Sequence, residues 1–168
     1  MEACEVCGFV WESVPADEVA ARISTGVAGV VRAILEAESV VQRPTPERWS
    51  QLEYAAHVRD VLLHVRDRIV IALVEDNPSF KPLYRDERVD RGLYAGDTVE
   101  SVIEGLTVAV ALFIQTFLAL DDGQLARPCQ YVYPTAQTRS LLWVGQQVVH
   151  EVEHHAGDIA ENAQLLAG

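Results

Sequence analysis

The chain has 168 residues, of which 49% are hydrophobic and 23% charged, and its formal net charge is −12. This size and composition predict a single folded domain spanning residues 1–168, and they exclude a disordered or fibrous chain. Because so acidic a protein repels phosphate backbones and anionic lipids, we expect neither a nucleic-acid partner nor a membrane partner.

The N-terminal segment, residues 1–14, carries the C-x-x-C motif of Cys4 and Cys7. Its acidic start does not resemble a signal peptide, and no apolar run reaches the roughly 18–20 residues that would cross a bilayer. We therefore expect a cytoplasmic protein with reduced cysteines. The motif is half of a zinc-ribbon pattern, but no second C-x-x-C follows. We interpret the segment as one that packs on the domain through Phe9 and Trp11.

Two helices are predicted in the first half of the chain. The first runs from about Pro15 to Ser39, with apolar residues at helical spacing. The second begins with the capping box of residues 50–53, flanked by a hydrophobic staple of Trp49 and Tyr54, and reaches about Val74.

Two further helices are predicted after the polar connection of residues 77–96, whose length is typical of functional loops. One opens with the capping box of residues 97–100 and runs to about Leu120. The last begins after Tyr133-Pro134-Thr135 and runs to about Leu166. No alternating run is long enough for a sheet, so we predict an all-α four-helix bundle.

The last helix contains two i,i+4 pairs that compete as metal ligands, His150 with His154 and Glu151 with His155. At about 100° per residue, Glu151 and His155 fall within about 40° of the apolar stripe, whereas His150 and His154 fall on a polar face. That apolar stripe includes Val144, Val148 and Ile159. Since an isolated carboxylate on a core face is costly, we predict that Glu151 and His155 bind a metal and that the other two histidines are solvated. The alternative is that Glu151 and His155 form only a hydrogen bond near the core.

The third ligand is predicted to be His57, at the edge of the buried side of the second helix. His64 lies two turns further along, about 10 Å away, and cannot share the same metal. A His, His and carboxylate set with open positions is typical of a catalytic site. Zinc suits these ligands best, with nickel, iron and manganese as alternatives.

Residues around this site suggest supporting roles. Asp60 and Asp158 each follow a proposed histidine ligand by three residues, which is suitable for orienting an imidazole. Three arginines flank the metal end and could hold a substrate carboxylate, although we favour a solvated role for each: Arg43, Arg48 and Arg59.

Two stretches resemble the DinB/YfiT-like family of metalloenzymes, and within it the branch that contains mycothiol-dependent maleylpyruvate isomerase. Residues 48–60 resemble the W-S-x-x-E-Y-x-x-H-V-x-D helix start, whose histidine binds metal. Residues 150–159 resemble the final helix of that branch, with E-x3-H followed by x-x-D-[LI]. The resemblance implies a four-helix bundle with a long crossover, and metal ligands at His57, Glu151 and His155.

The family resemblance also implies an activity. The metal would hold the sulfur of a low-molecular-weight thiol (mycothiol, bacillithiol or glutathione) as a thiolate. We therefore expect a metal-dependent thiol S-transferase or isomerase acting on a small molecule. The alternative is a non-catalytic protein that binds a metal or a small molecule. Apolar exterior positions such as Ile114 and Leu118 leave room for a homodimer.

Overall fold

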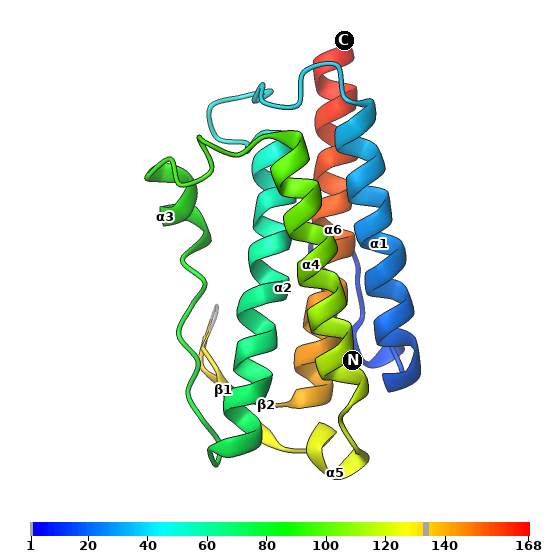
Figure 1. Ribbon diagram of the computed structural model, residues 1–168, viewed down its shortest axis with the longest axis vertical. Coiled ribbons are helices and arrows are strands. Elements are labelled where there is room, and N and C mark those ends of the chain that lie inside the picture. The colour runs from blue at the N-terminus through cyan, green and yellow to red at the C-terminus, as the bar shows by residue number, and fades with distance from the viewer. Residues whose placement is uncertain (1, 133–134) are drawn as a thin grey trace.

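The computed structural model describes residues 2–132 and 135–168. Four long helices make up most of the molecule (Figure 1): α1 (Ala16–Glu36), α2 (Gln51–Val74), α4 (Val99–Leu118) and α6 (Leu141–Ala167). Shorter elements lie in the connections: the 3-10 helix η1 (Trp11–Ser13), α3 (Arg85–Asp90), α5 (Asp122–Leu125), β1 (Pro128–Tyr131) and β2 (Gln137–Ser140). The predicted four-helix bundle is confirmed, and the structure adds a two-stranded antiparallel sheet, β1–β2, where no sheet was expected.

The direction of the helices explains the long connection in the middle of the chain. α1 and α6 run one way and α2 and α4 the other, so the chain must return along the bundle after α2 before α4 begins (Figure 1). α1 packs on α4 and α6, and α2 packs on the same two helices. The connection carries α3 and runs beside α2, which places it over the side of the bundle that holds the functional site.

The start of α2 has the predicted cap. The Ser50 hydroxyl accepts from the Glu53 backbone N–H at 3.2 Å, and the Glu53 carboxylate accepts from the Ser50 N–H at 2.7 Å. The rings of Trp49 and Tyr54 lie 5.3 Å apart, as a hydrophobic staple requires. This cap sets the helical phase of His57, which faces α6 from the second turn.

Two predicted helix starts are wrong. α4 is capped by Thr98 with Ser101, one residue later than expected, because the Asp97 carboxylate instead accepts from Arg59 at 3.0 Å. α6 begins at Leu141, because residues 137–140 pair antiparallel with β1. The strands have four residues each, too few to show a period in the sequence. Tyr133 and Pro134, part of the expected start, lie outside the described residues.

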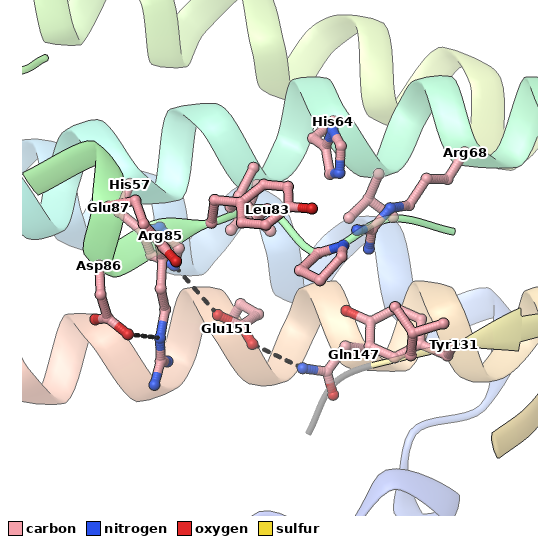
Figure 2. Close-up of a pocket in the computed structure, with 15 residues that line it drawn as sticks. His57, His64, Arg68, Leu83, Arg85, Asp86, Glu87, Tyr131, Gln147 and Glu151 are labelled. Atoms are coloured by element: carbon pink, nitrogen blue, oxygen red, sulfur yellow. Dashed lines mark hydrogen bonds and ion pairs between the residues drawn. The ribbon is translucent and has the colours of Figure 1, made fainter. Parts of the chain in front are cut away.

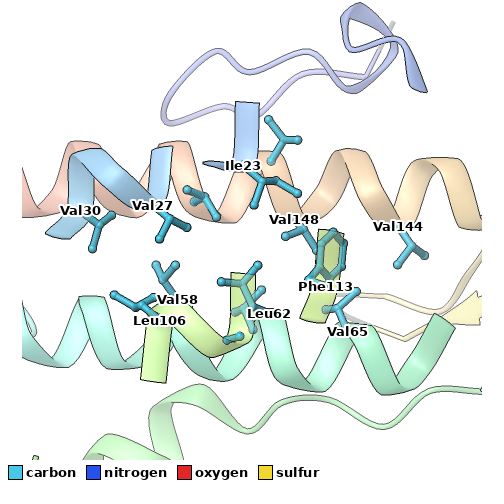
Figure 3. Packing of buried hydrophobic residues seen from close by; sticks show 14 of the residues in the cluster. Ile23, Val27, Val30, Val58, Leu62, Val65, Leu106, Phe113, Val144 and Val148 are labelled. Carbon is cyan, nitrogen blue, oxygen red and sulfur yellow. The ribbon is translucent and has the colours of Figure 1, made fainter. Parts of the chain in front are cut away.

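The core lies between the four helices, filled by branched aliphatic side chains and Phe113 (Figure 3). Among the described residues, α4 alone is long and apolar enough by length and composition to cross a membrane, with a mean hydropathy of 1.8. The expectation that no run would qualify is therefore corrected. One face of α4 nevertheless packs into the core through Leu106, Ala109 and Phe113. Val108, Leu112 and Leu118 on α4 are exposed, and the homodimer stays a prediction.

Replacing either of two glycines of α1 by alanine is expected to change the stability of the fold, in opposite directions for the two positions. A Cβ on Gly26 would lie 2.5 Å from Val152 Cγ1 of α6, whereas a Cβ on Gly29 would meet no atom within 4 Å. We expect Gly26→Ala to destabilise the fold by about 1–3 kcal/mol through overpacking. Gly29→Ala should stabilise it by up to about 1 kcal/mol through helix propensity. Denaturant unfolding of both variants measures the difference, and equal effects would show that α1 and α6 do not pack this closely.

Candidate metal centre

The three predicted ligands come together between α2 and α6. His57 Nε2 lies 3.4 Å and His155 Nε2 lies 3.3 Å from the same oxygen, Glu151 Oε2. The imidazole rings are 4.8 Å apart, centroid to centroid. His57 is 1% and His155 4% exposed. The two helices therefore aim three potential ligand atoms at one point, where both imidazoles are buried and the Glu151 side chain is 19% exposed.

The distances between these atoms are those expected between the ligands of a divalent metal. In a tetrahedral site with bonds of about 2.0–2.1 Å, neighbouring ligand atoms lie about 3.3–3.4 Å apart. The two observed distances match this spacing. His155 Nε2 is buried, and its contact with Glu151 Oε2 at 3.3 Å is its one polar contact among the residues that the structure describes, without the geometry of a regular hydrogen bond; such a weakly satisfied ring nitrogen is costly unless another species is bound.

The electrostatics of the group favour a cation. Burial raises the pKa of Glu151, but hydrogen bonds from His155 and His57 outweigh it and lower that pKa well below its usual value. Burial lowers the pKa of His57, against the opposing effect of Glu151. Burial also lowers the pKa of His155, but Asp158 and Glu151 raise it to about 9. In the metal-free protein, a proton on His155 thus takes the place of a cation next to the Glu151 carboxylate.

Neighbouring side chains fix the orientation of two of these predicted ligands. Gln147 Nε2 donates to Glu151 Oε1 at 2.7 Å, so that Oε2 is the oxygen that faces the histidines. Trp11 Nε1 in turn donates to Gln147 Oε1 at 2.8 Å. On the other side, His155 Nδ1 lies 2.8 Å from Asp158 Oδ2, which leaves Nε2 for the centre. Asp158 therefore lies where the sequence predicted an acceptor.

Asp60, the other predicted acceptor, does not contact His57. Its carboxylate accepts from Arg59 at 3.0 Å, from Arg88 at 2.6 Å and from the Tyr94 hydroxyl at 3.1 Å. Asp60 lies three residues after His57 on α2, and its side chain therefore faces the long connection and not α6. The carboxylate therefore anchors α3 and the segment that follows it, and it does not orient an imidazole.

Aromatic side chains from the start of α2 shield the centre. The Tyr54 ring stacks on His155 with centroids 5.4 Å apart, and the Trp49 ring meets His57 edge-on at 5.4 Å. Asn162 Nδ2 donates to the Trp49 carbonyl at 2.7 Å and ties this corner to α6. The staple that begins α2 therefore also excludes water from one side of the centre.

A cavity of about 260 Å³ opens on the other side of the centre (Figure 2). His57 and Glu151 form one end, and the connection between α2 and α4 covers it with residues 82–87. Its other lining residues include His64, Arg68, Tyr131 and Gln147. The long connection thus has the functional position that its length suggested.

The charged group at the far end of the cavity is Arg68, which the sequence analysis did not select. It is 6% exposed, donates to the Lys81 carbonyl, and stacks near the rings of Phe80 and Tyr131. Within the described part of the chain it makes no ion pair. No sequence pattern marks Arg68 as a cavity residue, because it lies in a largely apolar helix and the cavity forms only when residues 80–87 fold back over α2.

The arginines that were selected lie elsewhere. None of the three lines the cavity beside the centre. Each pairs with a nearby carboxylate, Arg43 with Glu53, Arg48 with Glu161 and Arg59 with Asp97. Their charges are satisfied within the fold, so their positions do not support the alternative that they hold a substrate carboxylate.

The expectation that His150 and His154 are solvated is wrong. Both are only partly exposed, and the His150 ring packs 5.2 Å from Phe9 and 4.9 Å from Trp11. The N-terminal segment covers this face of α6, with Phe9 and Trp11 buried as predicted.

Cys129 is buried as well, and burial raises the pKa of its thiol to about 11, which makes it a poor nucleophile.

Comparison with known families and structures agrees with this architecture. The family model of the DinB superfamily matches residues 29–159. YfiT from Bacillus subtilis, described as a probable metal-dependent hydrolase with an unusual four-helix bundle topology, superposes with a TM-score of 0.80 at 16% identity. That match covers 99% of this chain and 94% of YfiT.

The mycothiol-dependent maleylpyruvate isomerase superposes with a TM-score of 0.71 at 15% identity, over 90% of this chain and 63% of the isomerase. A histidine-to-alanine mutant of an isomerase with the same description gives 0.70 at 14% identity. This chain therefore spans less than two thirds of the isomerase. No curated protein matches the sequence. At these identities the likeness shows a shared fold.

Proposed function

The chain belongs to the DinB superfamily, and we propose that it is a divalent-metal-dependent enzyme that uses a low-molecular-weight thiol for S-transfer or isomerisation. The observation that carries this proposal is the convergence of His57, Glu151 and His155 at one end of a cavity. Zinc is the metal we propose, because two imidazoles and one carboxylate suit it. The mycothiol dependence of one structural relative supports a thiol.

His57, Glu151 and His155 would hold the metal at the end of the cavity, with one protein ligand fewer than the four that zinc usually takes. When bound there, the metal would stabilise the thiolate form of a thiol at neutral pH, or lower the pKa of a water molecule if the enzyme is a hydrolase. The protein supplies the geometry. Gln147 holds Glu151, Asp158 holds His155, and the rings of Trp49 and Tyr54 keep water from the opposite side.

The cavity favours a small substrate with an anionic group. A buried guanidinium without a carboxylate partner is costly, and an anion that enters the cavity would relieve this cost. The protein as a whole has a net charge of −12, whereas two arginines, Arg68 and Arg85, line this cavity. His64 lies one helical turn before it, with a buried Nε2 that has no partner among the described residues.

The test is a thiol-conjugation assay. Metal-loaded protein is incubated with mycothiol, bacillithiol or glutathione and a generic electrophile, and consumption of the thiol is followed. We expect turnover with at least one thiol, lost on chelation and in His155→Ala. Protein that holds its metal but turns over none of the thiols would instead favour the alternative, a non-catalytic metal or small-molecule binding protein. Metal-dependent ester or amide cleavage without thiol would favour a hydrolase, the description given to YfiT.

Replacing Arg68 is expected to weaken substrate binding more than turnover. Arg68→Met keeps the apolar stem but removes the charge, and a charge-assisted hydrogen bond to an anion contributes about 2 kcal/mol. We expect KM for the anionic substrate to rise by about 30-fold with kcat changed far less. Arg66→Met is the matched control, because Arg66 lies on the same helix and pairs with Asp67 outside the cavity. Equal kinetics for the two variants would exclude Arg68 from substrate binding.

A further inference from the structure

The N-terminal segment forms a tight turn around its two cysteines. The Cys4 N–H donates to the Phe9 carbonyl at 2.8 Å, and the Gly8 N–H donates to the Cys4 carbonyl at 2.9 Å. Gly8 has a φ of 74°, a left-handed conformation that glycine adopts without strain. An isolated antiparallel bridge between Ala3 and Val10 closes the turn. The turn therefore holds the Cys4 and Cys7 side chains close together without joining them, since both are free thiols.

The backbone of this turn also favours the thiolate form of Cys4. Burial raises the pKa of its thiol, but hydrogen bonds from the backbone of Cys7 and Val6 outweigh it and lower that pKa below its usual value. Backbone N–H groups directed at a sulfur stabilise negative charge on it, which is the state in which cysteine binds a metal.

The turn lies on the face of α6 that carries His150 and His154. Both nitrogens of His150, and Nδ1 of His154, are buried without a hydrogen-bond partner in the described part of the chain. Half-buried imidazoles with no partner are unusual, because each unpaired nitrogen loses its bonds to water and gains none in return. One ring nitrogen of each histidine lies within 4.8 Å of the sulfur atoms of Cys4 and Cys7.

One ligand atom from each of Cys4, Cys7, His150 and His154 lies within 4.8 Å of the other three. We infer that these four residues form a second metal site, a structural zinc site that joins the N-terminal segment to α6. The inference of this site does not rest on the proposed enzymatic activity. Two thiolates and two imidazoles give a closed tetrahedral site of the Cys₂His₂ type, with no position left for a substrate. The thiolates select zinc over magnesium or calcium.

The geometry requires only small adjustments to close around a metal. Ligand atoms in such a site lie about 3.3–3.8 Å apart, so the present separations, none above 4.8 Å, must shorten by about 1–1.5 Å at most, and Cys7 is exposed. His154 also lies 3.7 Å from Asp158, but that carboxylate is already bonded to His155 at 2.8 Å. Asp158 therefore belongs to the first centre, and His154 remains for the second. Two zinc-bound thiolates with two neutral imidazoles also leave no net charge in the site.

The second site would support the first through the N-terminal segment. Fixing Cys4 and Cys7 on α6 also fixes Trp11, whose indole N–H holds Gln147, and Gln147 holds Glu151. The two centres lie on adjacent residues of one helix, because Glu151 follows His150 and His155 follows His154. A structural metal here would therefore keep the ligand carboxylate of the first centre in its orientation.

Cobalt substitution tests the inference on the unmodified chain. Protein with reduced thiols is freed of metal and titrated with Co²⁺. We expect two equivalents to bind, together with an intense near-ultraviolet band from thiolate-to-cobalt charge transfer, since only the second site contains sulfur. Elemental analysis of zinc-loaded protein should likewise give two zinc ions per chain.

Variants assign the band to its site. The double variant Cys4→Ser/Cys7→Ser should lose the band and one equivalent, whereas His155→Ala should lose one equivalent and keep the band. Cys129→Ala, which removes the remaining thiol, should change neither. The inference is overturned if the wild-type protein shows no charge-transfer band, if the band survives the double substitution, or if mass spectrometry finds Cys4 and Cys7 disulfide-bonded in protein purified with zinc. The wild-type spectrum decides the question even if the double variant fails to fold.

Discussion

Glu151→Gln is expected to lower the metal affinity of the His57–Glu151–His155 centre by about 1,000-fold. The amide keeps the size of the side chain and can still bond to Gln147, but it lacks the charge that a divalent cation needs from its carboxylate ligand. Changes of residues that only orient a ligand already cost about 10–100-fold in affinity, so loss of the single anionic ligand should cost more. Competition with a chromophoric chelator measures the affinity directly.

Glu153→Gln is the matched control for this substitution. Glu153 lies on the same helix and pairs with Arg22 on the surface, away from the centre. Its replacement should leave metal affinity within about twofold of the wild type and alter stability only slightly, as is usual for exposed ion pairs. Because the second proposed site contains no residue changed here, the cobalt charge-transfer band should persist in both variants. Unchanged affinity in Glu151→Gln would show that Glu151 is not a ligand.

The convergence of these ligands was predictable because each rests on local rules. The cap at Ser50 fixes the phase of α2, and with it the direction of His57. On α6 the helical period alone separates Glu151 and His155 from the neighbouring histidines. Asp158 follows from the same rule, since three residues place it beside His155 on one face. Where the helix that carries a side chain also sets its direction, the sequence is sufficient to predict that direction.

The wrong predictions concern residues whose surroundings are set by a second element of the structure. His150 and His154 lie on a polar face of α6, but that face is covered by the N-terminal segment. The missing half of the C-x-x-C motif was sought as another cysteine pair, whereas the structure places two histidines of a distant helix beside it. The role of Asp60 was predicted wrongly and Arg68 was overlooked for the same reason, because the connection that contacts both has no periodic signal in the sequence.

Metal affinity at the first centre is expected to rise about tenfold per pH unit between about pH 7 and pH 9. Burial lowers the pKa of His155, but Asp158 and Glu151 raise it to about 9, so a metal must displace one proton from this residue below that pH. The pKa of His57 is lowered by burial and that of Glu151 is lowered well below its usual value. These two residues therefore release no proton in this range, and the slope should be close to one proton per metal.

Asp158→Asn tests the origin of this slope. The amide cannot hold the imidazolium as the carboxylate does, so the pKa of His155 should fall and the affinity should become nearly independent of pH above about pH 7. At pH 9 the variant should bind metal about 10–100-fold more weakly than the wild type, because His155 is less well oriented. A chelator of known pH dependence provides the measurement. The metal-free wild type should also lose stability as the pH rises through about 9. Below that pH the raised pKa of His155 favours the folded state, because the folded protein binds the proton more tightly than the unfolded chain. A flat affinity profile in the wild type would mean that His155 carries no proton for the metal to displace.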